Sequence, residues 1–210
     1  DVERSFVEQV AIAIRFSASD PDRNRDLLAE GTLYVARFQE NGELEWLPLV
    51  HGQGPLTVAN GPESQADVLI ETRRAADLLG ATPMDRPEDV QPNARTGRVY
   101  VMLTNNTARS ATQTNAANPR ASNAAGHMIE IIEPDGDFSA TRSRWEVLVL
   151  CGDPSRSESG ARWNVATSPH GWFAAPDNCT IDPRGRLWVA TDGNEATGAN
   201  DGLWAMVTEG

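Results

Sequence analysis

An internal repeat constrains the fold of this chain more than any other feature of its sequence. Each copy contains an acid after a proline, a Gly-Arg turn, a strand with an aromatic centre, and a threonine followed by Asn or Asp. The copies read RPED, GRVYV and TN within residues 86–105, and APDN, GRLWV and TD within residues 175–192. Their acids, Glu88 and Asp177, are separated by 89 residues. Since one β-propeller blade takes about 40–50 residues, this spacing predicts a propeller with the copies about two blades apart.

The recurring acid indicates where a site would lie. Repetition around a propeller places equivalent points of different blades at the same end of a central channel. We therefore expect Glu88 and Asp177 to contribute to one shared site near the propeller axis.

The net charge limits the partners that the chain can bind. It is −12 at pH 7, from 18 Lys and Arg against 30 Asp and Glu. Such a surface repels nucleic-acid phosphates and anionic membranes, so we expect neither as a partner. Crowded carboxylates favour bound cations, which neutralise their mutual repulsion. Acidity also serves solubility, and charge alone leaves both interpretations open.

The pattern along the chain predicts an all-β protein with one inserted helix. The helix is expected over residues 65–79, where Ser64 can cap its start and Gly80 can end it. No composition shift marks a domain boundary, so residues 1–210 are expected to form a single domain, a partial propeller of three or four blades. Short apolar runs between Gly/Pro-rich turns predict strands near residues 10–16, 31–38, 43–50, 89–91, 98–103, 127–132, 144–150, 179–181, 187–189 and 202–207.

Residues 107–126 form a long segment rich in Ala, Asn, Thr and Ser with no apolar period. Loops of this length inside compact domains are usually functional or disordered. Asn118, Arg120 and Asn123 present two amides and a guanidinium around Pro119, and we consider them candidate substrate-binding residues. A solvated surface loop is the alternative interpretation.

The two cysteines and three histidines carry little functional signal. Cys151 and Cys179 lie outside any C-x-x-C pair and look like small buried hydrophobic residues, with a disulfide left open. The histidines are scattered and are expected to be structural. The chain begins at Asp1 within a pattern, which suggests a piece of a longer protein.

The motifs described so far resemble those of the PhoX family of alkaline phosphatases, from about Leu27 to Gly193. This resemblance implies a six-bladed propeller with two ferric ions and three calcium ions around a bridging oxide. It also implies hydrolysis of phosphomonoesters and export to the periplasm or the medium. The segments that carry it are GTLYVARF (31–38), GATPMDRPED (80–89), TGRVYVMLTNN (96–106), NPRASNAAGHMIE (118–130) and PDNCTIDPRGRLWVATDG (176–193).

The resemblance also assigns roles to individual residues. It implies that Arg86 binds phosphate in catalysis, that Glu88 bridges iron and calcium, and that Asp177 and Asp192 are calcium ligands. These groups suit the chemistry, because carboxylates are preferred by hard cations and arginine offers a planar fork for phosphate oxygens. Without the resemblance, a surface ion pair of Arg86 with Glu88 is the simpler interpretation.

The family's iron-binding cysteine and further acidic ligands should precede the Arg-Pro-Glu stretch, and Cys151 and Cys179 do not occupy that motif. We therefore expect only part of the metal cluster here, and no activity from the chain alone. Two alternatives stay open: a non-catalytic calcium-binding propeller module and a lactonase-type propeller hydrolase. An incomplete propeller is also expected to self-associate through its open strand edges.

Overall fold

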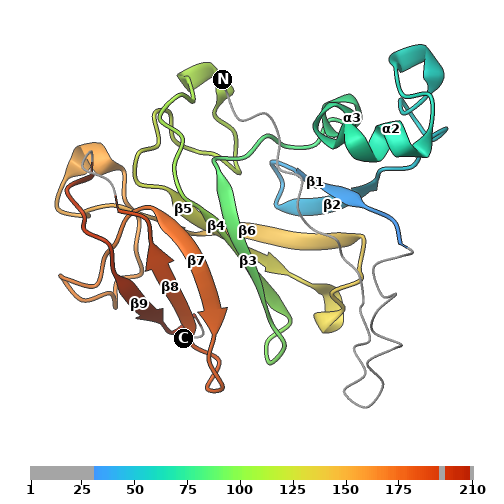
Figure 1. Cartoon of the computed structure of the whole chain (residues 1–210). Helices are drawn as coiled ribbons and strands as arrows, with labels where there is room; N and C mark the ends of the chain where they lie inside the picture. The colour runs from blue at the N-terminus through green and yellow to red at the C-terminus, as the bar shows by residue number, and fades with distance from the viewer. Residues whose placement is uncertain (1–30, 194–196, 209–210) are drawn as a thin grey trace.

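The computed structural model describes residues 31–193 and 197–208 of the chain. These residues form two antiparallel sheets (Figure 1). The strands of the larger sheet are β1 (Tyr34–Phe38), β2 (Glu43–Pro48), β3 (Pro87–Asn93), β4 (Arg98–Leu103), β5 (His127–Ile132) and β6 (Arg142–Leu150). Their spatial order is β1-β2-β6-β5-β4-β3. Strands β3 to β6 therefore form the four-stranded meander of a propeller blade, and the β1–β2 hairpin extends it through β6.

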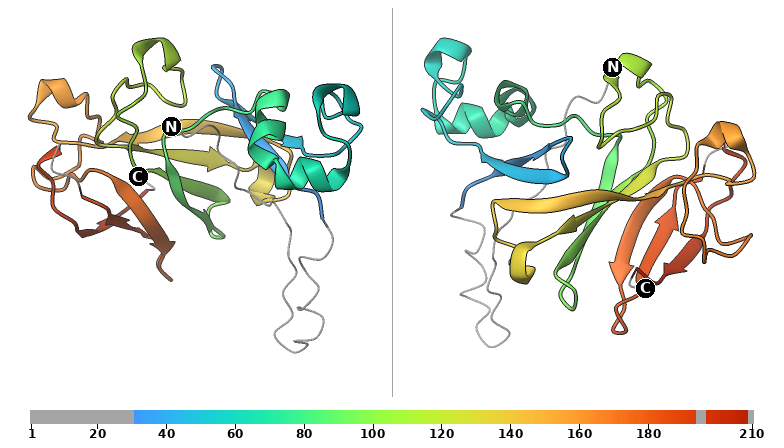
Figure 2. Two further views of the ribbon diagram at one scale, coloured as in Figure 1. Left: turned by 45° about the horizontal axis from the view of Figure 1, so that its top comes forward. Right: turned by 180° about the vertical axis from the view of Figure 1, so that it is seen from behind.

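The second sheet contains β7 (Pro176–Ile181), β8 (Leu187–Thr191) and β9 (Leu203–Met206), in that order. Its first strand, β7, lies beside β3, the edge strand of the larger sheet (Figures 1 and 2). The chain is thus predominantly β within the described ranges, which confirms the predicted all-β class.

Residues of β4 alternate between two cores, because successive side chains of a strand point to opposite faces. Val99, Val101 and Leu103 pack with β1, β2 and β5 in one apolar cluster. Tyr100 and Met102 face the second sheet and pack with residues such as Leu187. A strand buried on both faces explains why the sequence at β4 is an almost continuous apolar run.

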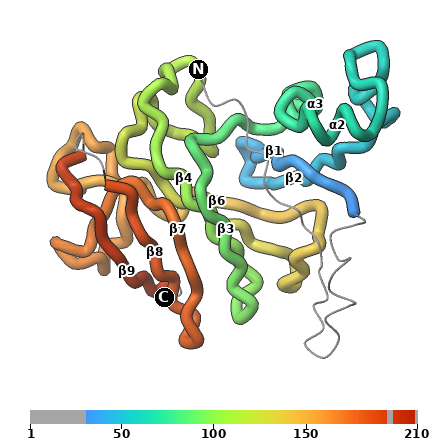
Figure 3. The backbone as a smooth tube through the Cα atoms, viewed as in Figure 1, coloured from blue at the N-terminus to red at the C-terminus, as the bar shows by residue number. Residues whose placement is uncertain are grey.

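The two copies of the repeat lie in neighbouring sheets, and the prediction that they are two blades apart was wrong. The first copy forms β3 and β4, and the second forms β7 and β8. Residues 104–126 and 151–175 account for the long spacing, since they are loops with only the 3₁₀ turns η2 (Ala111–Gln113) and η4 (Ser157–Ser159) (Figure 3). The described residues accordingly form fewer than the three or four blades expected.

The inserted helix is interrupted where one continuous helix was predicted. It consists of α2 (Gln65–Ile70) and α3 (Thr72–Leu79), separated at Glu71, whose φ and ψ are −93° and 39°. The Thr72 hydroxyl donates to the Leu69 carbonyl and so competes with the helical backbone pattern. The predicted ends are confirmed: Ser64 accepts from the Asp67 amide, and Gly80 is left-handed with φ 73°. Both helices pack on the β1–β2 hairpin through Val68, Ala75 and Ala76.

Several further predictions can be compared with the structure. The strand predicted at residues 10–16 lies outside the described residues. Cys151 and Cys179 are both buried and free, so the disulfide left open by the sequence does not form. Two further 3₁₀ turns occur, η1 (Val58–Asn60) and η3 (Pro134–Gly136). None of the described helices is long and apolar enough to cross a membrane.

Gly126→Ala is expected to destabilise the fold by roughly 3 kcal/mol or more. Gly126 has φ 72°, and an added Cβ would overlap the carbonyl oxygens of Leu103 and Thr104. Gly80→Ala is the matched control, because Gly80 has φ 73° with no atom within 4 Å of the added Cβ. The control is expected to lose only about 1–2 kcal/mol of unfolding free energy, the cost of a left-handed backbone at a residue with a Cβ. If urea unfolding shows that Gly126→Ala and Gly80→Ala lose the same unfolding free energy, the close packing at Gly126 is contradicted.

Candidate functional site

Matching β-bulges occur at the start of β3 and at the start of β7. In the first copy Pro87 is opposite Leu103, and the next paired residue, Val90, is opposite Val101. In the second copy Pro176 is opposite Thr191, and Cys179 is opposite Val189. Each bulge therefore inserts one extra residue at the acid of the copy, Glu88 or Asp177. A bulge bends the strand and redirects side chains, which is why such irregularities often lie beside functional sites.

The residue before each bulge has an unusual backbone conformation. Arg86 has φ 41° and Ala175 has φ 54°, in the left-handed region that non-glycine residues rarely adopt. The carbonyl of Arg86 accepts from the Thr104 amide at 3.0 Å, and that of Ala175 accepts from the Asp192 amide at 2.9 Å. The two copies are thus the same in local geometry, strained residue included.

These hydrogen bonds correct the alignment of the repeat by one residue. The sequence comparison matched Asp192 with Asn105, after the threonine of each copy. In the structure Asp192 is equivalent to Thr104, because each donates to the carbonyl before the bulge. From the Gly-Arg turn to the end of the second strand the copies are 88 positions apart, as Gly97 and Gly185 are, so Thr191 is equivalent to Leu103 rather than to Thr104.

The side chains of Arg86 and Glu88 contact each other at the start of β3, although the left-handed backbone of Arg86 and the bulge depart from the extended backbone that the prediction assumed. The Arg86 Nη2 donates to Glu88 Oε1 at 3.1 Å, and Nη1 donates to Asn105 Oδ1 at 3.3 Å. The side chains of Arg86 and Glu88 are 37% and 35% exposed, so both can be reached from solvent. This contact alone fits either a surface ion pair or a pair that binds phosphate and metal, so the residues around it must distinguish the two interpretations.

The surroundings of Asp177 are more informative. Burial raises the pKa of the Asp177 carboxyl above its ordinary value, and the carboxylates of Asp192 and Asp89 raise it further. Arg86 and the Thr104 hydroxyl act in the opposite direction. The fold therefore holds several negative charges near one another and near the Arg86 guanidinium. A bound cation would relieve the repulsion among these carboxylates.

The donors in this region fit hard cations in kind but are incomplete in number. Carboxylate oxygens are the ligands that calcium and ferric iron favour. No three His, Cys, Asp or Glu side chains within residues 31–193 and 197–208 stand close enough together to enclose an ion. A complete coordination shell would need ligands from elsewhere.

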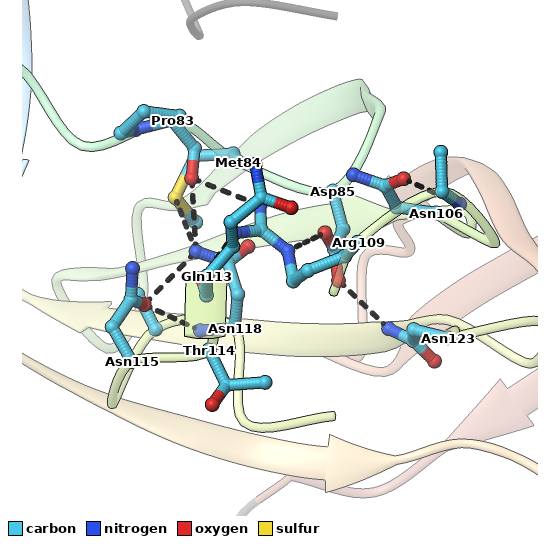
Figure 4. Close-up of polar contacts among 12 residues, drawn as sticks. Pro83, Met84, Asp85, Asn106, Arg109, Gln113, Thr114, Asn115, Asn118 and Asn123 are labelled. Atoms are coloured by element: carbon cyan, nitrogen blue, oxygen red, sulfur yellow. Dashed lines mark hydrogen bonds and ion pairs between the residues drawn. The ribbon is translucent and has the colours of Figure 1, made fainter. Parts of the chain in front are cut away.

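A buried ion pair lies directly before Arg86 in the sequence (Figure 4). Asp85 is fully buried and pairs with Arg109 at 2.5 Å. Asp85 also accepts from the Asn123 amide at 3.0 Å, and Arg109 donates to the Pro83 carbonyl at 3.1 Å. The Asn123 amide nitrogen is in turn 3.1 Å from Nδ1 of His127, whose Nε2 donates to a backbone carbonyl. This network attaches the long loop between β4 and β5 to the segment that leads into Arg86.

The three loop residues predicted to bind substrate make mainly internal contacts. Asn118 is buried and donates to the Pro83 carbonyl at 2.9 Å, and Asn123 belongs to the ion-pair network. Arg120 donates to the carbonyls of Cys151, Ser159 and Gly126. The structure gives these side chains a role in building the loop, and their contact with a substrate stays a prediction.

A pocket in the described part of the chain lies beside this loop. It has a volume of about 370 Å³ and lies between residues 120–125 and 152–160, with Thr197 at its edge. Arg120 and Asn123 contribute to its wall, but Arg86, Glu88, Asp177 and Asp192 do not. Its wall contacts the second bulge through the backbone, since the Ala125 carbonyl accepts from the Ala175 amide at 2.7 Å.

Sequence reasoning missed Asp85, Asp89, Thr104 and Arg109. Asp85 and Asp89 flank the Arg-Pro-Glu stretch, so their acidity next to the motif was a signal that could have been used. Thr104 and Arg109 gave no such signal, because their roles depend on contacts across the fold, with Pro176 and with Asp85.

Comparison with known proteins identifies the family. The model of the family Alkaline phosphatase PhoX matches residues 9–210. A solved structure, Pseudomonas fluorescens PhoX in complex with vanadate, a transition state analogue, matches with a TM-score of 0.83 and 32% sequence identity, over 92% of this chain. No curated protein matches the chain. The chain belongs to the PhoX family of alkaline phosphatases, and the predicted family and propeller class are confirmed.

The chain spans 36% of the length of the Pseudomonas fluorescens protein. It therefore corresponds to a part of that relative, in keeping with the incomplete set of metal donors.

The buried network is expected to make stability depend on pH through His127. Burial lowers the pKa of His127 from 6.5 to about 4, and this outweighs the nearby Asp85 carboxylate. Below pH 6.5 the unfolded chain therefore gains a proton that the folded chain does not. Stability is complete above pH 6.5 and falls as the pH approaches 4, by about 2 kcal/mol between pH 7.5 and pH 5.

Guanidinium unfolding at the two pH values measures this loss. His127→Gln lacks the titrating ring and should show a smaller difference between pH 7.5 and pH 5. An equal difference in the variant and the wild type would assign the pH dependence to other groups.

Proposed function

We propose that this chain supplies the phosphate-binding arginine and part of the metal-ligand set of a phosphomonoesterase active site. The observation that carries the proposal is that the Asp177 carboxyl lies near the Asp192 and Asp89 carboxylates and near the Arg86 guanidinium. Repelling carboxylates next to a guanidinium suit a site that takes both a cation and an anion. Membership of an alkaline phosphatase family makes phosphate the natural anion.

Each residue has a proposed role. Arg86 would hold phosphate oxygens with its planar fork, and Asn105 would keep the guanidinium oriented. Glu88, Asp177 and Asp192 would hold calcium and ferric ions. When bound, such ions supply positive charge that stabilises the phosphoryl group during hydrolysis. Arg86 would release Glu88 for the metal when substrate arrives, since both side chains are partly exposed.

The substrate is proposed to be a small phosphomonoester. The pocket beside Arg120 and Asn123 would accommodate its alcohol portion, because its wall combines small residues with polar ones. Asn118 would act there only indirectly, through the loop that it stabilises. The acidic surface disfavours nucleic acid and anionic membranes as partners. A periplasmic or secreted location is proposed on the family alone.

Self-association of the 210-residue chain is also proposed, through the open edge of the second sheet. Within the described residues β9 pairs only with β8, and Leu203 and Val207 near that edge are 67% and 76% exposed. An exposed apolar edge is a template for pairing with another chain. Size-exclusion chromatography that shows a monomer at all concentrations would contradict this.

A non-catalytic calcium-binding module is the second candidate, because the carboxylates near Asp177 would suit a calcium ion without any catalysis. Arg86 distinguishes it from the phosphatase. A calcium module needs no arginine beside the acids, and neither does a lactonase.

Arg86→Ala is expected to lower kcat/KM for p-nitrophenyl phosphate by about 100-fold or more, because one charged oxyanion donor typically contributes that much. The assay needs the longer protein of which we propose this chain to be a part, since the chain alone is expected to be inactive. Arg184→Ala, which removes an exposed arginine from a turn, is the matched control. If Arg86→Ala keeps full turnover, the role of Arg86 is wrong.

Metal content separates the two candidates. Elemental analysis of the longer protein after dialysis should find calcium or iron, and Glu88→Gln with Asp177→Asn should lower that content. Metal without any phosphatase activity in the longer protein would favour the calcium-binding module.

A further inference from the structure

We propose that Asp89 is a positioning residue that holds the two bulges at a fixed spacing and so sets Glu88 and Asp177 against each other. Asp89 itself is not assigned as a metal ligand or a substrate contact. The proposal rests on the proposed function of Glu88 and Asp177, and it adds the residue that determines how they meet.

The Asp89 carboxylate accepts hydrogen bonds from both strands. Its Oδ2 accepts from the backbone amide of Cys179 on β7 at 2.7 Å. Its Oδ1 accepts from the Val90 amide on β3 at 2.7 Å, and from the Gln91 side chain at 3.3 Å. One side chain thus joins two strands that belong to different sheets.

The bulges explain why a carboxylate is needed at this position. A bulge disrupts the ladder of backbone hydrogen bonds, and a backbone amide that loses its partner is costly to bury. Val90 and Cys179 are the residues at which the register resumes after each bulge. A carboxylate can accept from both amides at once, and hydrogen bonds to a charged acceptor are about twice as strong as neutral ones.

A second contact from the first copy completes the arrangement. The Thr104 hydroxyl donates to the Pro176 carbonyl at 2.8 Å, and this pair is buried. The second bulge is therefore held at Pro176 by Thr104 and at Cys179 by Asp89. Asp177 lies between these two points. Its position relative to Glu88, the neighbour of Asp89 in the sequence, is consequently set by the first copy.

The second copy has no equivalent of Asp89. Asn178 occupies that place, and it is exposed. The carboxylate also places negative charge near Asp177, which is unfavourable unless the bridging hydrogen bonds compensate. Asp89 therefore differs from its counterpart in the second copy, as expected of a residue that joins the two copies through its hydrogen bonds.

The test is a titration with terbium(III), a luminescent ion that prefers carboxylate oxygen as calcium does, of the longer protein of which we propose this chain to be a part, after its metals are removed with a chelator, on wild type and variants. Asp89→Ala is expected to weaken terbium binding about 10-fold or more, the usual effect of losing a residue that orients metal ligands. Asp89→Asn keeps one acceptor oxygen and should restore part of the affinity. Glu88→Gln with Asp177→Asn marks the signal that belongs to this site.

Asn93→Ala is the matched control. The Asn93 side chain, at the other end of β3, donates to the Gly185 carbonyl in the turn between β7 and β8 at 3.4 Å. Its loss should lower the unfolding free energy but leave terbium affinity unchanged. Amide hydrogen exchange at Cys179 gives a second measurement that needs no metal: exchange should accelerate in Asp89→Ala and stay slow in Asn93→Ala.

The outcomes separate the two proposals. Wild-type affinity in Asp89→Ala, or unchanged exchange at Cys179, overturns the role of Asp89 and leaves the proposed function intact. A wild-type longer protein whose terbium binding does not depend on Glu88 and Asp177 overturns the metal site, and the positioning role with it. If Asp89→Ala and Asn93→Ala weaken terbium binding equally, Asp89 contributes only to the stability of the fold, and this outcome also overturns the proposal.

Discussion

The junction between β3 and β7 determines how the rest of this structure can work. These strands are edges of separate sheets. Apolar side chains of β4, such as Tyr100 and Met102, pack against the second sheet, and hydrogen bonds of the Asp89 and Thr104 side chains with the backbone of β7 hold the edges together. Each of these hydrogen bonds fixes the two strands at one residue, whereas a continuous ladder of backbone hydrogen bonds would fix their whole length. Glu88 and Asp177 lie next to the hydrogen bonds made by Asp89 and Thr104, so the distance between the two acids depends on these few residues.

A second constraint acts on the same region from the other side. The buried pair of Asp85 with Arg109 attaches the loop between β4 and β5 to the segment before Arg86. Buried charges are costly unless they are paired and hydrogen bonded, and here Asn123 and backbone carbonyls complete the pairing. Arg86 thus lies between a rigid segment and a bulge, which explains how its left-handed backbone is maintained.

Family membership and local geometry support the same interpretation from independent directions. The family comparison connects the chain to alkaline phosphatases, and the structure places carboxylates and a guanidinium at one end of two adjacent sheets. The chain spans about a third of its relative, and the donors described here are too few to enclose an ion. A site shared between distant parts of a longer propeller is consistent with both observations.

The sequence by itself determined the local features and the family. The alternation at β4, the caps at Ser64 and Gly80, the Arg-Pro-Glu motif and the repeat all depend on residues near one another in the chain. Tertiary structure decided which sheets are neighbours, the equivalence of Asp192 with Thr104, and the role of Asp89. The bond from Cys179 to Asp89 joins residues 90 positions apart, and no local pattern specifies such a contact. The physical reason is that side-chain partners across sheets depend on packing and bulge register, which exist only once the whole chain has folded.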